Sequence, residues 1–425
     1  MYNRQNKGKI ALISVHGDPS IDIGKEEAGG QNVYVREIGE ALGGKGWQVD
    51  MFTRKVYAEQ ANIVEHSPNV RTIRLAAGPE KFIGRDHLFE YLPEFVKSFF
   101  NFQAQTHTLY PIIHTNYWLS GWVGLELRKH HLFRHIHTYH SLGAVKYRSV
   151  TTVPLVANTR LSVEKQCLET ADCIVATSPQ EEQDMRSLVS RGGNIEIIPC
   201  GTDIKRFASV DRDSAREKLL IDPDAKVILY VGRFDRRKGI ETLVRAVGRP
   251  EVRKHEKLQL IIVGGSQPGQ IDGLERERIE TIVEELGLEK ITFFAGQISH
   301  SELPNYYAAA DVCVIPSYYE PFGLVTIEAM ASGIPVVASD VGGLRFTVVS
   351  SKTGLLVESK NSPAFAEAIN RILSDPAWGK ELGRAGQRRV NSFFSWDGVA
   401  SQMEDLYQCQ LAHLHREFFA TKVVS

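Results

Sequence analysis

The chain has 425 residues, a formal net charge of −1 and a hydrophobic fraction of 43%. These values are typical of a globular protein with two or three domains, and they exclude a disordered or fibrous chain. The near-neutral charge gives no sign of a nucleic-acid partner or of a membrane-surface partner.

Short β-rich runs alternate with helical segments along most of the chain. The predicted strands are Ile10–Val15, Gln48–Thr53, Val70–Leu75, Pro111–His114, His135–Tyr139, Cys173–Thr177, Ile195–Pro199, Val227–Val231, Leu258–Val263, Ile291–Phe294, Val312–Ile315 and Pro335–Ala338. Continuous apolar runs favour strands that are covered on both faces. The alternation therefore predicts an α/β protein with parallel, doubly wound sheets.

The domain boundary is predicted near residue 205. The turn-rich segment Pro199–Asp203 follows the seventh strand, and the polar helix predicted over Asp213–Leu219 precedes a new strand. This gives one domain over residues 1–204 and a second over 205–395, each about the size of a doubly wound domain. The segment from Trp396 to the end is predicted to be helical and to pack back on the first domain.

The cysteines and the apolar runs indicate the cellular compartment. Five cysteines form no Cys-x-x-Cys pair, so the sequence supports neither a zinc site nor a disulfide framework. Cys173 and Cys313 lie within apolar runs and are predicted to be core residues. No apolar stretch approaches the roughly 20 residues that span a bilayer, and Ile10–Val15 is predicted to be a strand rather than part of a signal peptide. We therefore expect a cytoplasmic protein without an integral membrane segment.

The first strand-to-helix junction contains Gly29 and Gly30, followed by a predicted helix with Val35, Ile38 and Leu42 at helical spacing. Open parallel sheets bind ligands at the carboxyl ends of their strands. Glycines at a helix start allow a ligand to approach the backbone, where free N–H groups favour a phosphate. Taken alone, the pair favours a generic tight turn over a ligand site.

The second domain opens with a cluster of cations, Val231-Gly-Arg-Phe-Asp-Arg-Arg-Lys-Gly239. A run of charges usually marks a solvated surface. Here it follows a predicted parallel strand, and this position favours anion binding. A fixed arginine and lysine, Arg233 and Lys238, would neutralise a departing diphosphate.

The segment Tyr319–Ala331 follows the strand Val312–Ile315. Residues Gly323, Leu324 and Val325 are predicted to form a first helical turn that offers backbone N–H groups to phosphate. Glu328 lies among apolar residues of that helix and needs hydrogen-bond donors, which a ribose diol supplies. Glu320 precedes the turn and is placed to accept bonds from sugar hydroxyls. Capping or surface roles are the alternative for each glutamate.

Glu320 and Glu328, with seven residues between them and Pro-Phe-Gly inside the interval, resemble the signature of the retaining, GT-B-fold glycosyltransferases of the group that contains sucrose-phosphate synthase. The resemblance covers nearly the whole chain. Its further motifs, in order, are Gly29-Gly30-Gln31, His140-Ser141-Leu142-Gly143, Pro199-x-Gly201-x-Asp203, Gly232-Arg233 with Lys238-Gly239, Val263-Gly264-Gly265 and Gly342-Gly343.

The resemblance implies a donor site for a nucleotide sugar. The implied donor residues are Gly30, Arg233, Lys238, Gly264, Ile298, Glu320, Gly323, Leu324, Val325 and Glu328. Arg233 and Lys238 bind the diphosphate, Glu328 the ribose and Glu320 the transferred sugar, while Ile298 edges the nucleobase. His140 lies beside the sugar near its 6-hydroxyl, so that His140, Arg233, Lys238 and Glu320 form the catalytic set. A satisfied strand-end histidine is the alternative for His140.

The resemblance also implies an acceptor site in the first domain. Its residues are Gln31, Lys81, Tyr117, Lys146 and Arg160. Lys81 belongs to a loop, Gly78–Phe82, whose lysine meets an acceptor phosphate in the family. The sequence departs from sucrose-phosphate synthases at Asn158-Thr159-Arg160, where two nearby arginines are expected.

These features predict a retaining transferase that moves glucose from UDP-glucose to fructose 6-phosphate and yields sucrose 6-phosphate and UDP. No metal and no other cofactor is expected. Asp211-Arg212-Asp213 has the spacing of an Asp-x-Asp metal motif but fits a capped helix start better. The expected partners are the two substrates and a separate sucrose-phosphate phosphatase. The alternatives are an inositol phosphate or lipid-linked sugar acceptor, and, in another class, a nucleotide-sugar epimerase or a non-catalytic sugar-nucleotide sensor.

Overall fold

The computed structural model describes residues 7–21, 29–148 and 153–423, with side chains described as far as residue 416. The chain folds into two compact units, the first comprising Met1–Pro199 with Trp396–Ser425 and the second Cys200–Ser395. The second unit starts at Cys200 instead of residue 205. The reason lies in its hydrogen bonds: the Thr202 amide donates to the Phe394 carbonyl at 2.8 Å, and Thr202 forms a β-bridge with Ser395.

The first unit is built on an eight-stranded sheet in the order β3-β4-β2-β1-β5-β6-β7-β8. Its strands are β1 (Lys9–Ile13), β2 (Gln48–Arg54), β3 (Ile63–Ser67), β4 (Val70–Leu75), β5 (Ile112–Asn116), β6 (Arg134–Thr138), β7 (Cys173–Ala176) and β8 (Ile195–Ile197). All neighbours are parallel except β3, which pairs antiparallel with β4 at the edge. The order reverses around β1, as in doubly wound folds.

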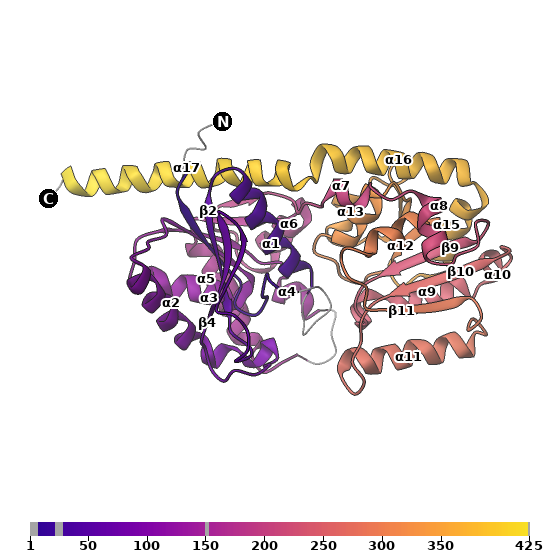
Figure 1. Ribbon diagram of the computed structural model, residues 1–425, viewed down its shortest axis with the longest axis horizontal. Helices are drawn as coiled ribbons and strands as arrows, with labels where there is room; N and C mark the ends of the chain where they lie inside the picture. The colour runs from indigo at the N-terminus through magenta and orange to yellow at the C-terminus, as the bar shows by residue number, and fades with distance from the viewer. Residues whose placement is uncertain (1–6, 22–28, 149–152, 424–425) are drawn as a thin grey trace. The chain divides into compact units, whose positions relative to one another are not determined.

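Helices α1 (Gly30–Gly44), α2 (Leu92–Thr106), α3 (Tyr117–Arg128), α4 (Gly143–Lys146), α5 (Ala157–Thr170) and α6 (Pro179–Leu188) connect these strands, and 3₁₀ turns η1 (Arg85–His87) and η2 (Phe89–Tyr91) precede α2. The C-terminal helix α17 (Trp396–Val423), yellow in Figure 1, lies against α1 of this unit. It is anchored by the buried Tyr407, whose hydroxyl is 2.7 Å from His114 Nδ1. The Trp47 indole also donates to Glu404 at 3.2 Å.

The second unit contains a six-stranded parallel sheet in the order β11-β10-β9-β12-β13-β14. Its strands are β9 (Lys226–Val231), β10 (Leu258–Val263), β11 (Thr292–Gly296), β12 (Val312–Ile315), β13 (Val336–Ser339) and β14 (Leu355–Val357). Its helical elements are α7 (Ile204–Phe207), α8 (Arg212–Lys218), η3 (Arg236–Lys238), α9 (Ile240–Val247), α10 (Pro250–Arg253), α11 (Ile271–Glu285), α12 (Leu303–Ala309), α13 (Leu324–Ala331), α14 (Leu344–Thr347), α15 (Ser362–Ser374) and α16 (Pro376–Phe393).

Each unit encloses its own apolar core between sheet and helices. In β10, Leu260 and Ile262 are fully buried, as a continuous apolar run in a covered parallel strand requires. Cys173 and Cys313 are also fully buried, so their prediction as core residues is confirmed.

Every predicted strand is present, with ends that differ by at most two residues. Two strands are additional. β3 is a half-exposed edge strand with polar residues, and β14 has three residues, so neither forms a long apolar run. The predicted helix Asp213–Leu219 is α8, and the Asp211 carboxylate caps it by accepting from the Ser214 amide at 3.0 Å. Asp211 therefore serves as a helix cap, as the sequence indicated.

None of the described helices has the length and apolar character that crossing a membrane requires.

Candidate active site

In the second unit, the turn before α13 is shaped by glycine. Gly323 is the N-cap residue at φ +92°, and a Cβ atom there would lie 2.6 Å from Leu344 Cδ2. The helix begins at Leu324, one residue later than predicted. Its first amides, at Leu324 and Val325, have no carbonyl one turn earlier in the helix to bond, and they are the groups that bind anions at helix starts.

The Lys238 ammonium donates to Glu320 Oε2 at 2.5 Å, and the Ser317 hydroxyl donates to the same oxygen at 3.2 Å. Lys238 ends the 3₁₀ turn η3, and Gly239 follows it at φ +67°. A Cβ atom on Gly239 would lie 2.1 Å from the Pro316 carbonyl oxygen, so only glycine brings this turn so close to the end of β12. The backbone thus places the predicted diphosphate and sugar residues in direct contact.

The backbone of Glu320 is held by a second glycine pair. Its carbonyl accepts from the Gly343 amide at 2.9 Å, and a Cβ atom on Gly342 would lie 2.2 Å from that carbonyl oxygen. The Gly342-Gly343 motif therefore positions the backbone of Glu320.

Three of the four cations after β9 each lie against a different carboxylate. Arg237 pairs with the Asp235 carboxylate, which also accepts from the Arg237 amide at 2.9 Å. Burial tends to raise the pKa of Asp235, but the Arg237 guanidinium and amide outweigh it and hold the pKa at about 2. Arg236 is exposed and lies 3.5 Å from Glu275, while Arg233 is half-buried after Gly232. Lys238 is thus the cation of this cluster that meets Glu320.

Glu328 is buried within α13 with a 7% exposed surface. Its Oε2 accepts from the Tyr307 hydroxyl at 2.8 Å, and its Oε1 lies 3.7 Å from His300 Nε2. The half-buried Ile298 lies in the loop that leads from β11 to His300. Gly264, after β10, donates its amide to the Gly296 carbonyl at 2.9 Å, which joins the two loops at this edge of the sheet.

In the first unit, His140 follows β6 in a left-handed conformation at φ +58°. Its Nε2 is 2.8 Å from Asn116 Oδ1, and its ring packs edge-on against Tyr34 at 4.8 Å between centroids. Burial lowers the pKa of His140 to about 3, so the imidazole is neutral near pH 7. Since Oδ1 of an amide only accepts, Nε2 carries the proton and Nδ1 is the acceptor of this ring.

Gln31 lies in the first turn of α1, next to Gly30. Its amide nitrogen donates to Ser14 Oγ at 2.9 Å and lies 3.4 Å from the Asn116 carbonyl oxygen. Ser14 directly follows β1, and Asn116 is the last residue of β5. The structure therefore brings Gln31 to the carboxyl ends of the strands, where His140 also lies.

Arg160 is 1% exposed and is enclosed by protein partners. Its Nε donates to Glu164 at 2.7 Å, its Nη1 to the Tyr117 hydroxyl at 3.1 Å and its Nη2 to the Ser141 carbonyl at 2.5 Å. Tyr117 itself is buried, at φ +74°. Arg160 and Tyr117 therefore form one cluster, with the guanidinium oriented by neighbours rather than exposed to solvent.

Lys146 ends the short helix α4, whose first amide, at Gly143, donates to both carboxylate oxygens of Glu164 at 3.0 and 2.9 Å. Glu164 thus links the Lys146 helix to Arg160. Lys81 lies elsewhere, exposed on the loop that follows β4. The buried Arg54 guanidinium donates to the carbonyls of this loop at Ala77, Pro79 and Lys81.

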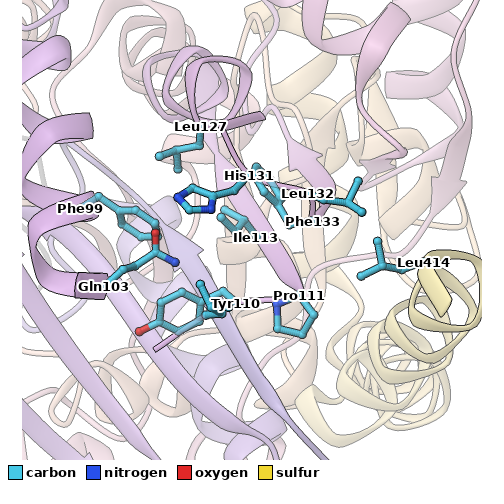
Figure 2. Close-up of a pocket in the computed structure, with 11 residues that line it drawn as sticks. Phe99, Gln103, Tyr110, Pro111, Ile113, Leu127, His131, Leu132, Phe133 and Leu414 are labelled. Atoms are coloured by element: carbon cyan, nitrogen blue, oxygen red, sulfur yellow. The ribbon is translucent and has the colours of Figure 1, made fainter. Parts of the chain in front are cut away.

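A pocket of about 310 Å³ in the first unit lies at the amino ends of β5 and β6, and Figure 2 shows the residues that line it. Tyr110 and Pro111 precede β5 and Phe133 precedes β6, whereas Asn116 and His140 come at the carboxyl ends of these strands. No carboxylate, lysine or arginine is among its lining residues. This pocket therefore does not match the chemistry of a phosphorylated ligand.

Sequence reasoning missed several residues that contact the predicted ones, among them Asn116, Tyr307, His300, Ser317 and Glu164. Asn116 directly precedes the predicted Tyr117 at a strand end, which was a usable signal. Tyr307 and His300 are 21 and 28 residues from Glu328, and no spacing rule connects them. Among the described residues, no three His, Cys, Asp or Glu side chains are grouped as metal ligands.

Comparison with known proteins gives consistent matches over both units. A family model described as glycosyl transferases group 1 matches residues 211–389, and one described as a glycosyl transferase 4-like domain matches residues 29–201. The D-inositol 3-phosphate glycosyltransferase of Corynebacterium aurimucosum is 35% identical to this chain, over 94% of this chain and 95% of the relative. The enzyme of the same name from Geodermatophilus obscurus is 36% identical, over 94% of this chain and 89% of the relative.

Among solved structures, a sucrose-phosphate synthase from Thermosynechococcus elongatus is 54% identical with a TM-score of 0.89, covering 96% of this chain and 100% of that one. The Anabaena protein Alr3699/HepE, solved with UDP and glucose, has a TM-score of 0.73 over 94% of this chain and 99% of its own. At 20% identity, the second match shows the fold alone.

Proposed function

The chain belongs to the group 1 glycosyltransferases and has their GT-B fold class, and we propose that it transfers glucose from UDP-glucose to fructose 6-phosphate with retention of configuration. The observation that carries this proposal is the 54% identity, over 96% of the chain, with the sucrose-phosphate synthase from Thermosynechococcus elongatus. The products are then sucrose 6-phosphate and UDP.

On the donor side, the proposal assigns the diphosphate to Lys238, Arg233 and the amides of Leu324 and Val325. Negative charge builds on the diphosphate as the glycosidic bond breaks, and fixed cations and helix-start amides stabilise that charge. Lys238 lies against Glu320 in the structure. This contact supports the assignment, because it puts the ammonium beside the residue to which we assign the sugar.

We assign the sugar hydroxyls to Glu320 and His140. The neutral imidazole of His140 has its Nε2–H directed to Asn116, so that Nδ1 accepts from a hydroxyl of the transferred sugar. No side chain is assigned as the base. In the family mechanism, the departing phosphate oxygen takes the proton of the attacking acceptor hydroxyl on the same face of the sugar.

The proposed chemistry needs no metal, because Lys238, Arg233 and the two amides supply positive charge at the leaving group. It needs no other cofactor. A separate phosphatase is the enzyme class that would consume the phosphorylated product.

A second candidate acceptor is D-inositol 3-phosphate. It is favoured by the 35–36% identity with D-inositol 3-phosphate glycosyltransferases over 94% of the chain, and by Asn158 and Thr159 standing before Arg160. Both candidates share a phosphate on a polyhydroxylated ring, which Lys146 and Lys81 would recognise by charge-assisted hydrogen bonds, while the buried Arg160 orients Tyr117 and Glu164.

The test is UDP release with UDP-glucose and a panel of fructose 6-phosphate, fructose and D-inositol 3-phosphate, with product identification by mass spectrometry. We expect fructose 6-phosphate to react fastest and fructose to react poorly. Faster reaction with D-inositol 3-phosphate would reassign the acceptor. A donor sugar that changes configuration with no UDP release in any mixture would indicate an epimerase, and binding without any turnover would indicate a sensor.

A further inference from the structure

Glu328 is one member of a chain of polar side chains in the second unit, in which Glu328 and Tyr307 are buried and His300 and Arg206 are half-buried. Its Oε2 accepts from the Tyr307 hydroxyl at 2.8 Å, and its Oε1 lies 3.7 Å from Nε2 of His300. On the far side of the imidazole, Arg206 Nη1 lies 2.6 Å from His300 Nδ1. The order Arg206, His300, Glu328, Tyr307 is thus fixed by side-chain contacts.

The proton positions in this chain follow from the donor types. An arginine guanidinium only donates, so His300 Nδ1 accepts and the ring proton of the neutral histidine is on Nε2. That Nε2 is buried and has no hydrogen-bond partner in the described part of the chain. A buried donor without a partner is costly unless something supplies an acceptor. Here the nearest carboxylate oxygen is Glu328 Oε1, just beyond hydrogen-bond distance.

Tyr307 acts from the other side. The side chain is fully buried in α12. Burial first, and the nearby Glu328 second, raise the pKa of Tyr307 far above 10, so its hydroxyl keeps its proton and donates. Packing of the ring fixes the hydroxyl, and the hydroxyl in turn fixes one carboxylate oxygen.

We propose that Tyr307 and His300 are positioning residues that hold the Glu328 carboxylate so that it accepts both ribose hydroxyls of a nucleoside diphosphate. Tyr307 fixes the rotation of the carboxylate through Oε2, and the His300 Nε2–H faces Oε1, with 3.7 Å between nitrogen and oxygen, and stabilises its charge. This inference rests on the proposed function, since it requires Glu328 to bind the ribose. It adds that discrimination between ribose and deoxyribose depends on these two neighbours.

The test is the ratio of dissociation constants for UDP and 2′-deoxy-UDP, measured by calorimetry on the full chain. A charged acceptor left without its hydroxyl partner typically weakens binding by about 10- to 100-fold, so the parent protein should prefer UDP by about that ratio. We expect Tyr307→Phe to reduce the preference about 3- to 10-fold. His300→Leu should also reduce it, whereas His300→Gln, which keeps an N–H near the Nε2 position, should restore most of it.

Tyr306→Phe is the matched control, because it removes a hydroxyl from the half-buried neighbouring residue and should leave the ratio unchanged. Thermal unfolding of each variant checks that it is folded. If Tyr307→Phe unfolds, the comparison of His300→Leu with His300→Gln decides the result.

The outcomes separate the two proposals. If the parent and Glu328→Gln both bind UDP and 2′-deoxy-UDP equally, Glu328 does not bind ribose, and that part of the proposed function fails together with this inference. If the parent prefers UDP and Glu328→Gln abolishes the preference, but folded Tyr307→Phe and His300→Leu retain it in full, the inference alone is overturned.

Discussion

Lowering the pH from 7 to 5 should destabilise the first unit, because three neutral histidines are buried in its sheet. His114, His135 and His137 are each 0% exposed. The Thr115 hydroxyl lies between His135 Nε2 and His137 Nδ1, at 2.8 Å from each. Burial lowers the pKa of His114 and of His135 to about 3 and that of His137 well below 6.5.

The direction in which stability changes with pH follows from how many protons the folded and the unfolded chain bind. An unfolded histidine titrates near pH 6.5, whereas these folded ones stay neutral well below that value, so the unfolded chain binds more protons between about pH 3 and pH 6.5. Stability therefore rises with pH in this window and is lost as pH falls. Between pH 7 and pH 5, each histidine costs about 2 kcal/mol, or about 6 kcal/mol for the three.

Glu181 opposes this effect. Burial raises the pKa of Glu181 to about 7, although the Thr177 amide and hydroxyl both donate to its Oε2 at 2.7 Å. Between about pH 4.5 and pH 7 the folded state therefore binds a proton that the unfolded chain does not. This stabilises the folded state by about 2 kcal/mol at pH 5 relative to pH 7. These three histidines outweigh the carboxyl by about 4 kcal/mol, a large part of the 5–15 kcal/mol that stabilises an ordinary domain. His140 and His66, whose pKa values burial lowers to about 3 and about 4, add to the loss in the same direction.

The assay is urea unfolding at pH 7 and pH 5, followed by tryptophan fluorescence. Trp47, Trp118, Trp122 and Trp396 lie in the first unit and Trp378 in the second, so the signal reports mainly on the first. His135→Gln keeps a nitrogen near Nε2 but cannot titrate, and it should reduce the loss between the two pH values by about 2 kcal/mol. His413→Gln, at an exposed position of α17, is the matched control. An equal loss in His135→Gln and in the parent would refute this reasoning.

Four further predictions concern the site. Lys238→Ala should lower kcat about 100- to 1,000-fold and change donor affinity much less, because charge on the diphosphate grows in the transition state; an unchanged kcat with a raised donor KM would show a role in binding alone. Lys81→Ala and Lys146→Ala should each raise the acceptor KM and leave the donor KM nearly unchanged; steady-state kinetics with each substrate varied decides this, and a donor KM raised as much as the acceptor KM would count against a role of these lysines in binding the acceptor. Arg160→Ala should destabilise the chain by about 3–5 kcal/mol in urea unfolding, because it leaves the buried Glu164 unpaired; a loss below about 1 kcal/mol would mean that Glu164 gains another partner. Turnover should persist in EDTA, and loss of activity that Mg²⁺ restores would contradict the metal-independent mechanism.

The fold was largely predictable from the sequence because parallel strands such as Leu258–Val263 are continuous apolar runs bounded by turns. The edge strand β3 was not, since Glu65, His66 and Ser67 carry no strand periodicity and gain their conformation by pairing with β4. The helix start at Gly29 and Gly30 was also predicted, and Gly29 is the N-cap of α1.

The site was predictable where chemistry lies in adjacent residues, as at Gly239 and Gly323. Two aspects were not predictable. The contact between Lys238 and Glu320 joins positions 82 residues apart, and it depends on how the turn after β9 meets the end of β12. The enclosure of Arg160 depends on Glu164 and Tyr117 together, so the sequence indicated a phosphate-binding cation where the structure shows a guanidinium with internal partners.

The return of α17 to the first unit has a consequence for how the chain is made. Tyr407 and Glu404 bond His114 and Trp47, so the first unit lacks part of its packing until α17 leaves the ribosome. Residues 200–395, by contrast, are contiguous and are synthesised in full before α17 emerges. Domains fold as units during synthesis. The second unit can therefore complete its folding before the first unit does, because the first unit still lacks α17 at that stage.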